Sequence, residues 1–217
     1  MNLRMVIADD REIVRSGLKS LLDSQPDIEV VGVAANGYEA VALARELRPN
    51  VCLFDIRMPG IDGIEATRLL AGPAVPQPMA VVVITTFDHD EYVYGALKAG
   101  ARGFLLKDAG PELLGQAIRA AANQDALIAP SVTARPLAEF ASAGTWRRQR
   151  TKVVDALTER EEEVLLAVAR GRTNAEIATD FDISLSTVKS HVASLMSKLG
   201  ARNRVEIAIW AYESKRV

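Results

Sequence analysis

Residues 51–63 read VCLFDIRMPGIDG and contain the transition that decides the fold. The apolar run Val51–Phe54 ends at Asp55, and two turn dipeptides, Pro59-Gly60 and Asp62-Gly63, precede a segment with helical spacing. A short, nearly continuous apolar run is typical of a strand that is buried on both faces of a parallel sheet. The stretch therefore predicts a strand, a polar loop at its carboxyl end, and a helix that follows.

The same order of elements recurs through the first 129 residues. The other predicted strands are Leu3–Ala8, Ile28–Val33, Ala80–Thr85 and Gly103–Leu106. The predicted helices are Arg11–Leu22, Tyr38–Leu47, Gly63–Leu70, Glu91–Ala99 and Pro111–Ala122. Strands that alternate with helices predict a parallel sheet covered on both faces. Five such units are too few for an eight-fold barrel, so the α/β fold is predicted to be an open, doubly wound sheet.

The rest of the chain has a different pattern. The periodicity fades over residues 126–153, which include the basic run Trp146–Arg150 and are predicted to be a linker. Four helical segments without an intervening strand follow: Glu159–Arg170, Asn174–Phe181, Leu185–Leu199 and Arg204–Ser214. We therefore expect an α/β domain at 1–125, the linker, and an all-α domain at 154–217.

Composition excludes several classes of protein. The single cysteine, Cys52, cannot form an intramolecular disulfide, which fits a reducing cytoplasm. The N-terminus has no pattern of a secretion signal, and no apolar stretch approaches the roughly 20 residues that cross a bilayer. We expect a cytoplasmic protein without a membrane partner. Its net charge of -2 conceals an acidic first half and a basic stretch from Ile183 to Val205 that has no acidic residue.

Polar side chains follow the predicted strands where each strand ends. Asp9 and Asp10 follow the first strand, Asp55 the third, Thr85 ends the fourth and Lys107 follows the fifth. Ligands of open α/β sheets bind at this edge, so we expect these side chains to converge there. Three carboxylates repel one another unless a cation intervenes, and Mg²⁺ prefers oxygen ligands. A carboxylate next to Mg²⁺ can attack phosphorus, while a lysine and a hydroxyl contact the transferred group.

These residues, together with Met58-Pro59-Gly60 and Phe104–Lys107, resemble the receiver domain of two-component response regulators. The resemblance implies a flavodoxin-like sheet of strand order 2-1-3-4-5 and Asp55 as the phosphoacceptor. It also implies Mg²⁺ bound by Asp9, Asp10, Asp55 and the main-chain oxygen of Arg57. Thr85 and Lys107 would contact the phosphoryl group, and Phe104 stands where the family has an aromatic side chain that swings inward on activation.

Three alternatives compete with this interpretation. An Asp-Asp pair after a strand is often a helix N-cap, a role that Asp10 could also fill. A haloacid-dehalogenase-like phosphatase also uses a strand-end aspartate, but it needs a second aspartate two residues later, where this chain has Arg57. Substrate turnover is therefore not expected, beyond slow autodephosphorylation. A receiver that acts without phosphate is the other possibility, and the complete set of five residues argues against it.

The last domain carries a helix-turn-helix pattern. Thr158 and Glu161 form a predicted capping box, and Gly171 ends that helix. A short helix, a turn at residues 182–184 and a longer helix capped by Ser184 or Ser186 follow. The first turns of such a second helix enter the major groove. The side chains predicted to contact DNA are those of Thr187, Lys189, Ser190, Ala193, Ser194, Lys198 and Arg204.

This segment resembles the LuxR-type helix-turn-helix, through residues that include Leu157–Glu161, Asn174–Ala178 and Lys198–Arg204. A receiver with this output domain has the NarL/FixJ-type architecture. The combination implies a transcription regulator that a sensor histidine kinase phosphorylates at Asp55 and that binds operator DNA as a homodimer. Because the last helix is rich in apolar residues, we expect Ile209 and Trp210 to contribute to the dimer contact.

Overall fold

The computed structural model describes residues 2–86, 90–123, 127–128, 156–201, 203–214 and 216–217. The chain divides after Ile128 into two compact units. They are called here the N-terminal unit, up to Ile128, and the C-terminal unit, described from residue 156 onward. Most of the predicted linker, including the basic run Trp146–Arg150, lies outside the described residues.

The N-terminal unit contains a parallel sheet of six described strands in the order β2-β1-β3-β4-β5-β6. The strands are β1 (Leu3–Ala8), β2 (Ile28–Ala34), β3 (Val51–Asp55), β4 (Val81–Thr85), β5 (Gly103–Leu106) and β6 (Leu127–Ile128). The predicted order 2-1-3-4-5 is confirmed. A sixth strand, β6, pairs with β5 at the edge of the sheet. It lies in the segment predicted to be the linker, and it could not be predicted because two residues are too few to show a periodic pattern.

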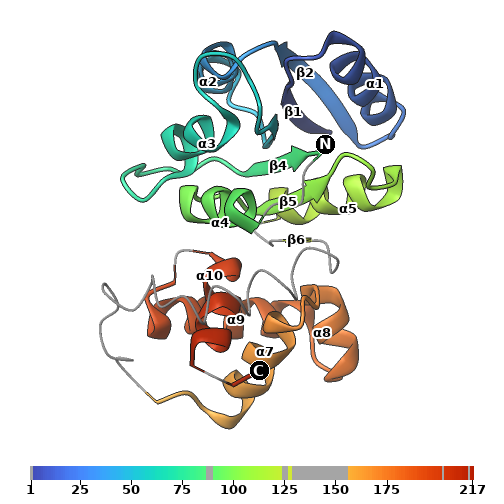
Figure 1. Cartoon of the computed structure of the whole chain (residues 1–217). Helices are drawn as coiled ribbons and strands as arrows, with labels where there is room; N and C mark the ends of the chain where they lie inside the picture. Colours follow the sequence, from blue (N-terminus) through green and yellow to red (C-terminus); the bar gives the residue numbers. More distant parts are fainter. Residues whose placement is uncertain (1, 87–89, 124–126, 129–155, 202, 215) are drawn as a thin grey trace. The chain divides into compact units, whose positions relative to one another are not determined.

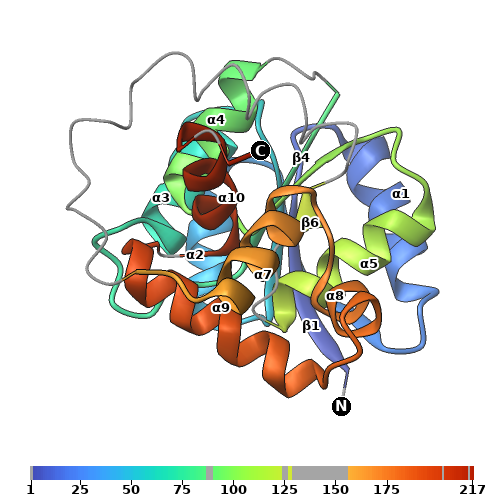
Figure 2. The ribbon, with the colours of Figure 1, turned by 90° about the horizontal axis from the view of Figure 1, so that it is seen from below.

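Helices cover both faces of this sheet, as the alternating pattern predicts. The helices are α1 (Glu12–Asp23), α2 (Gly37–Leu47), α3 (Gly63–Ala71), α4 (Asp90–Ala99) and α5 (Pro111–Ala122). Helices α1 and α5 pack together on one face, and α2, α3 and α4 cover the other (Figures 1 and 2). Every residue of β3 and β4 is buried. The carboxyl ends of these central strands lie at the edge of the sheet where open α/β folds bind ligands.

The described part of the C-terminal unit is helical: α7 (Glu159–Ala169), α8 (Asn174–Asp180), α9 (Leu185–Leu199) and α10 (Arg204–Glu213). The capping box of Thr158 and Glu161 is confirmed at the start of α7. Of the two serines considered, Ser184 caps α9 by accepting a hydrogen bond from the Thr187 N–H. Asp182, with φ 51°, turns the chain between α8 and α9. Helices α8 and α9 therefore form the predicted helix-turn-helix.

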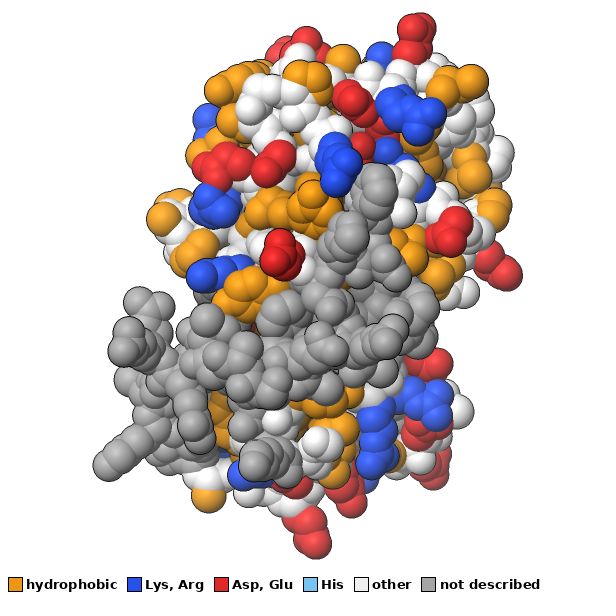
Figure 3. Space-filling view, in the orientation of Figure 1, with side chains coloured by type: hydrophobic (Ala, Val, Ile, Leu, Met, Phe, Trp, Pro, Cys, Tyr) orange, Lys and Arg blue, Asp and Glu red, His pale blue; other side chains and the backbone are white. Residues whose placement is uncertain are grey.

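The surface of the described residues is mixed in character. On the face shown in Figure 3, hydrophobic, basic and acidic side chains are interspersed over the described parts of both units. Among the described residues, no helix combines the length and the apolar composition that a membrane crossing requires.

Candidate functional site

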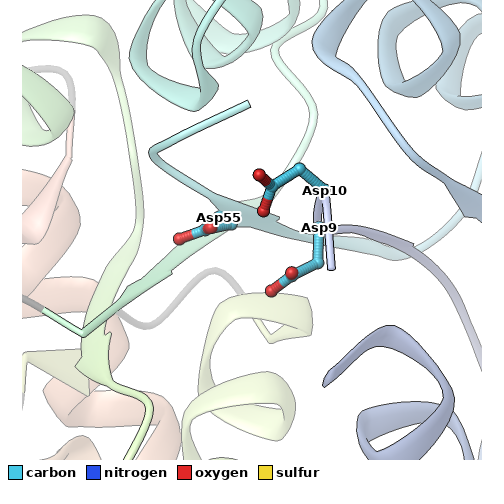
Figure 4. Close-up of side chains that lie close together, drawn as sticks. All are labelled: Asp9, Asp10 and Asp55. Carbon is cyan, nitrogen blue, oxygen red and sulfur yellow. The ribbon is translucent and has the colours of Figure 1, made fainter. Parts of the chain in front are cut away.

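The predicted polar side chains meet at the carboxyl edge of the sheet. Asp9 follows β1, Asp55 ends β3, and Figure 4 shows their carboxylates close to that of Asp10. One oxygen of each of the three carboxylates lies within 4.8 Å of the others. Asp9 and Asp55 are buried, whereas Asp10 is exposed, so the group opens to solvent on the Asp10 side. A parallel sheet brings together residues that are far apart in the chain because all of its strands end at the same edge.

Lys107 connects two of these carboxylates. Its Nζ lies 2.5 Å from Asp9 Oδ2 and 2.9 Å from Asp55 Oδ2. Its backbone N–H donates to the carbonyl oxygen of Thr85 at 2.7 Å, which ties the residue after β5 to the end of β4. Thr85 itself is 1% exposed. The structure therefore places Asp9, Asp55, Thr85 and Lys107 in one buried constellation, with Asp10 at its open side.

The other oxygens of the buried carboxylates accept backbone hydrogen bonds. Asp9 Oδ1 accepts from the Arg11 N–H at 2.9 Å, and Asp55 Oδ1 accepts from the Ile56 N–H at 2.9 Å. The cap by Asp10 that the Asp-Asp pair suggested is not formed, because α1 begins after Arg11 without a side-chain cap. Asp10 thus has no role in starting the helix and stays at the carboxylate cluster.

The charges of this cluster do not balance. Three carboxylates face one ammonium group, that of Lys107. Burial raises the pKa of Asp55, Lys107 lowers it by hydrogen bonding and charge, and the nearby carboxylate of Asp9 raises it again. A hard divalent cation with oxygen ligands fits this surplus of negative charge and the exposure of Asp10 to solvent. In such a setting a carboxylate can act as a nucleophile toward phosphorus.

The loop between β3 and α3 is held close to Asp55. A Cβ at Gly63 would lie 2.0 Å from the carbonyl oxygen of Asp55, so only glycine lets α3 begin against the strand end. Gly60 has φ 81°, and a Cβ there would lie 2.6 Å from the ring of Tyr38 on α2. The glycines of the two turn dipeptides therefore bring this loop against α2 and the end of β3.

Arg57 and Phe104 are the remaining predicted members of this site. The exposed Arg57 side chain donates to the Tyr92 hydroxyl of α4 at 3.2 Å, and its guanidinium lies 5.8 Å from the centroid of the Tyr92 ring. Phe104, in β5, is completely buried. Arg57 thus links the loop after Asp55 to helix α4, which follows β4.

A second candidate site lies on α9. Thr187, Lys189, Ser190 and Ala193 are exposed, whereas Val188, Val192, Leu195 and Leu199 are buried on the opposite side of the helix. The exposed hydroxyl of Ser190 donates to the carbonyl oxygen of Ser186 at 3.0 Å, one turn earlier in the same helix. The predicted division of α9 into a core stripe and an outward face is therefore confirmed for these residues.

Two other predicted DNA contacts are engaged within the unit. Ser194 Oγ donates to Glu161 Oε1 at 2.6 Å, and Lys198 Nζ lies 2.8 Å from Glu161 Oε2. Glu161 is 4% exposed and also accepts from the Thr158 N–H, so its capping box and its ion pair share one carboxylate. Hydrogen bonds from Lys198 and Ser194 lower the pKa of Glu161 to about 2, although burial acts in the opposite direction.

Burial also contradicts what the sequence analysis expected of Arg204 and Ile209. Arg204 is 6% exposed, and its NH1 donates to the side-chain oxygen of Asn174 at 2.5 Å. Ile209 is 3% exposed and lies in the core of the unit. Neither side chain is on the surface of this unit, because α10 packs on α7 and α9. Trp210 is half-buried, and the guanidinium of Arg216 lies 4.9 Å from the centroid of its ring.

Comparison with known families assigns both units. Residues 5–119 match the model of the response regulator receiver domain. Residues 155–211 match the model of bacterial regulatory proteins of the luxR family. Together the two matched ranges include nearly all of the described residues.

Several known regulators are similar to this chain along their whole length. The transcriptional regulatory protein LiaR of Bacillus subtilis is 38% identical over 99% of both chains. The response regulator protein VraR of Staphylococcus aureus is 37% identical over 98% of both chains. A solved structure of the two-component response regulator RcsB in complex with DNA covers all of both chains, with 27% identity and a TM-score of 0.57.

Proposed function

The chain belongs to the two-component response regulators that join a receiver domain to a LuxR-type DNA-binding domain, and we propose that Asp55 is its phosphoacceptor. The observation that carries this proposal is the contact of Lys107 Nζ with both Asp9 and Asp55. A lysine in that place partly neutralises the charge of the acceptor and of the carboxylate next to it. The donor would be a phosphohistidine of a sensor kinase: an Asp55 oxygen forms the new bond to phosphorus as the bond from phosphorus to nitrogen breaks.

Asp9, Asp10, Asp55 and the main-chain oxygen of Arg57 would hold Mg²⁺. The surplus of two negative charges over Lys107 supports this assignment, as does the spacing of the three carboxylates within 4.8 Å. When bound, Mg²⁺ supplies charge neutralisation for the oxygens of the transferred group. Lys107 would relieve the repulsion between Asp9 and Asp55 by pairing with both, and the cluster would accept the phosphoryl group on the side that Asp10 opens to solvent.

The response to phosphorylation would begin with Lys107 and Thr85. The phosphoryl group carries up to about two negative charges. Because Asp55 gives up its own charge in the new bond, the sheet edge gains a net charge of about -1. The Lys107 ammonium then pairs with a phosphoryl oxygen, and the Thr85 hydroxyl donates to another. Because the Lys107 backbone N–H donates a hydrogen bond to the Thr85 carbonyl oxygen, a movement of one residue would displace the other. Repacking of Phe104 and of the surface from α4 to β5 would follow as a change between two states.

Turnover of a phosphate ester is not part of the proposed function. The position two residues after Asp55 carries Arg57, whose guanidinium cannot act as a general acid, and whose side chain donates to Tyr92. The phosphoryl group would be released slowly by water. The protein would therefore act as a switch whose output is DNA binding.

The DNA contacts are proposed for the exposed side of α9, with Thr187, Lys189, Ser190 and Ala193 against the major groove. Ser194 and Lys198 could contact DNA only by breaking their bonds to Glu161, and Arg204 only by moving out of the core. Phosphorylation would favour a homodimer, because two helix-turn-helix units on one operator bind with higher avidity than one. With Ile209 buried, Trp210 remains as the proposed dimer contact on α10.

The test is phosphate-affinity electrophoresis after incubation with acetyl phosphate and Mg²⁺. Wild type, Asp55→Asn and Asp62→Asn are compared; Asp62 is an exposed carboxylate at the start of α3, and asparagine preserves its capping hydrogen bond. Retarded bands are expected for wild type and Asp62→Asn, and none for Asp55→Asn. A retarded band in Asp55→Asn would assign the acceptor to another residue. The absence of a band from all three, with the fold intact, would favour a receiver that works without phosphate or one that accepts phosphoryl only from its own kinase.

A further inference from the structure

An apolar side chain stands at the very start of α9, on the side proposed to face DNA. Leu185 is the first residue of the helix and is 46% exposed. Lys189 and Ala193 follow at intervals of four residues, so the three side chains lie one above another along the helix. All three are exposed. Leu185 is not among the DNA contacts predicted from the sequence.

The polar groups around this row are partly occupied by local hydrogen bonds. The hydroxyl of Ser186 is 2.7 Å from that of Ser184, and Ser190 Oγ donates to the Ser186 carbonyl. Lys189 makes no ion pair with a described residue, and residues 183–200 contain no carboxylate. The row therefore offers one cationic donor between an apolar side chain at the helix start and a methyl group farther along.

We propose that Leu185 is a specificity-determining residue that contacts the C5-methyl group of a thymine in each operator half-site. The proposal rests on the DNA-binding function proposed for α9. Base edges in the major groove are contacted by the first turn of a recognition helix, where Leu185 lies. The thymine methyl is the only apolar group that a base pair presents in that groove, so it is the feature that a leucine can read. Lys189, one turn later, would reach a guanine edge or a phosphate next to it.

The probe is a duplex that full-length wild type selects from a random DNA library in the presence of acetyl phosphate and Mg²⁺. Each thymine of that duplex is replaced singly by deoxyuridine, which removes the C5-methyl group and keeps the base pairing. One thymine in each half-site is expected to weaken wild-type binding about fourfold when replaced, as for the loss of one buried methyl-sized group. In Leu185→Ala the same replacement should change affinity by less than twofold.

Two further variants serve as controls. Leu185→Met keeps an apolar side chain of similar reach and should retain the sensitivity to deoxyuridine. Leu69→Ala removes a leucine that is 40% exposed in the N-terminal unit, and it should bind every duplex as wild type does. Helical circular dichroism of the variants, matched to wild type, establishes that they are folded.

The outcomes separate this proposal from the one on which it rests. If no sequence is enriched, DNA binding by α9 is itself overturned and the role of Leu185 falls with it. If a sequence is enriched and Lys189→Gln weakens its binding, but no deoxyuridine does, only the role of Leu185 is overturned. It is also overturned if Leu185→Ala and wild type lose the same factor at the same thymine, since the methyl group is then read by another residue.

Discussion

Asp55 and Glu161 are two buried carboxylates, one in each unit, whose pKa values shift in opposite directions. They are 5% and 4% exposed, and the lysine partner of each lies at nearly the same distance, 2.9 Å for Lys107 and 2.8 Å for Lys198. A nearby lysine is therefore common to both, but the balance of influences on the pKa differs. At Asp55 desolvation by burial is the largest influence and outweighs Lys107, whereas at Glu161 the hydrogen bonds from Lys198 and Ser194 outweigh burial.

At Asp55 the lysine is shared. Lys107 also contacts Asp9, and the exposed Asp10 adds a third carboxylate. At Glu161 the lysine is not shared with a second carboxylate among the described residues, and Ser194 and the Thr158 N–H donate as well. One carboxylate thus has too few partners for its charge and the other has enough. The first arrangement is what a site for a cation and a phosphoryl group requires, and the second is that of a structural ion pair.

The largest effect is expected from removing the fully satisfied carboxylate. Glu161→Ala leaves Lys198 without its ion-pair partner and α7 without half of its capping box, so we expect a loss of about 3 kcal/mol in the free energy of unfolding. Trp210 reports on this unit, and Trp146→Phe as the background removes the only other tryptophan. Urea unfolding followed by Trp210 fluorescence measures the change.

Glu163→Ala is the matched control. Glu163 lies on the same helix and pairs with Arg160 at 2.6 Å, but the Glu163 side chain is 48% exposed and that of Arg160 36%, so its loss should cost less than about 0.5 kcal/mol. Equal effects of the two substitutions would mean that the Glu161 pair is no stronger than a surface ion pair.

The same carboxylate should make the C-terminal unit sensitive to acid. Because the pKa of Glu161 is about 2 in the folded unit, below its ordinary value of 4.5, its ionised form is favoured by folding. Its contribution to stability is present above pH 4.5 and is lost as the pH falls toward 2. Urea midpoints measured across this window should fall less steeply for Glu161→Gln than for wild type. Parallel curves for the two proteins would count against the assignment.

A smaller effect of opposite sign is expected at the under-satisfied cluster. Asp10→Asn removes one of the surplus charges, so without Mg²⁺ the N-terminal unit should gain up to about 1 kcal/mol, the upper end for exposed charges. The variant should also lose most of the stabilisation that added Mg²⁺ gives wild type. Calorimetry in EDTA and in Mg²⁺ measures both changes, with Asp62→Asn as the control outside the cluster. A loss of stability in EDTA would show that Asp10 is a structural residue.

The sequence predicts the first of the two clusters but not the second. Asp9, Asp55 and Lys107 could be placed together because they end strands of one parallel sheet, and the topology brings all such ends to one edge. Only the local part of the second cluster was predictable. The capping box joins Thr158 and Glu161 over three residues, whereas the reach of Glu161 to Ser194 and Lys198 depends on how α7 packs on α9.

Helical periodicity has the same limit elsewhere in the C-terminal unit. It separates the buried Val188, Val192 and Leu195 from the outward face, because each stripe repeats within one helix. The periodicity of one helix does not show which of its remaining positions are covered by a neighbouring helix. Arg204 and Ile209 were expected on the surface for this reason, and packing of α10 on α7 and α9 buries them.

The smallest effect on stability is expected for Lys189→Gln, and it tests whether the lysines of α9 have separate roles. Lys189 is exposed, so the substitution should change the free energy of unfolding by less than about 0.5 kcal/mol. It should reduce the slope of log affinity against log salt by about one unit per half-site, because each half-site loses one lysine ammonium that neutralises a DNA phosphate. Lys198→Gln should instead lower stability and leave the slope nearly unchanged, since its ammonium is held by Glu161. An equal reduction of the slope by both substitutions would mean that Lys198 exchanges Glu161 for a phosphate when DNA binds, and the structural pair would then be part of the DNA-binding surface.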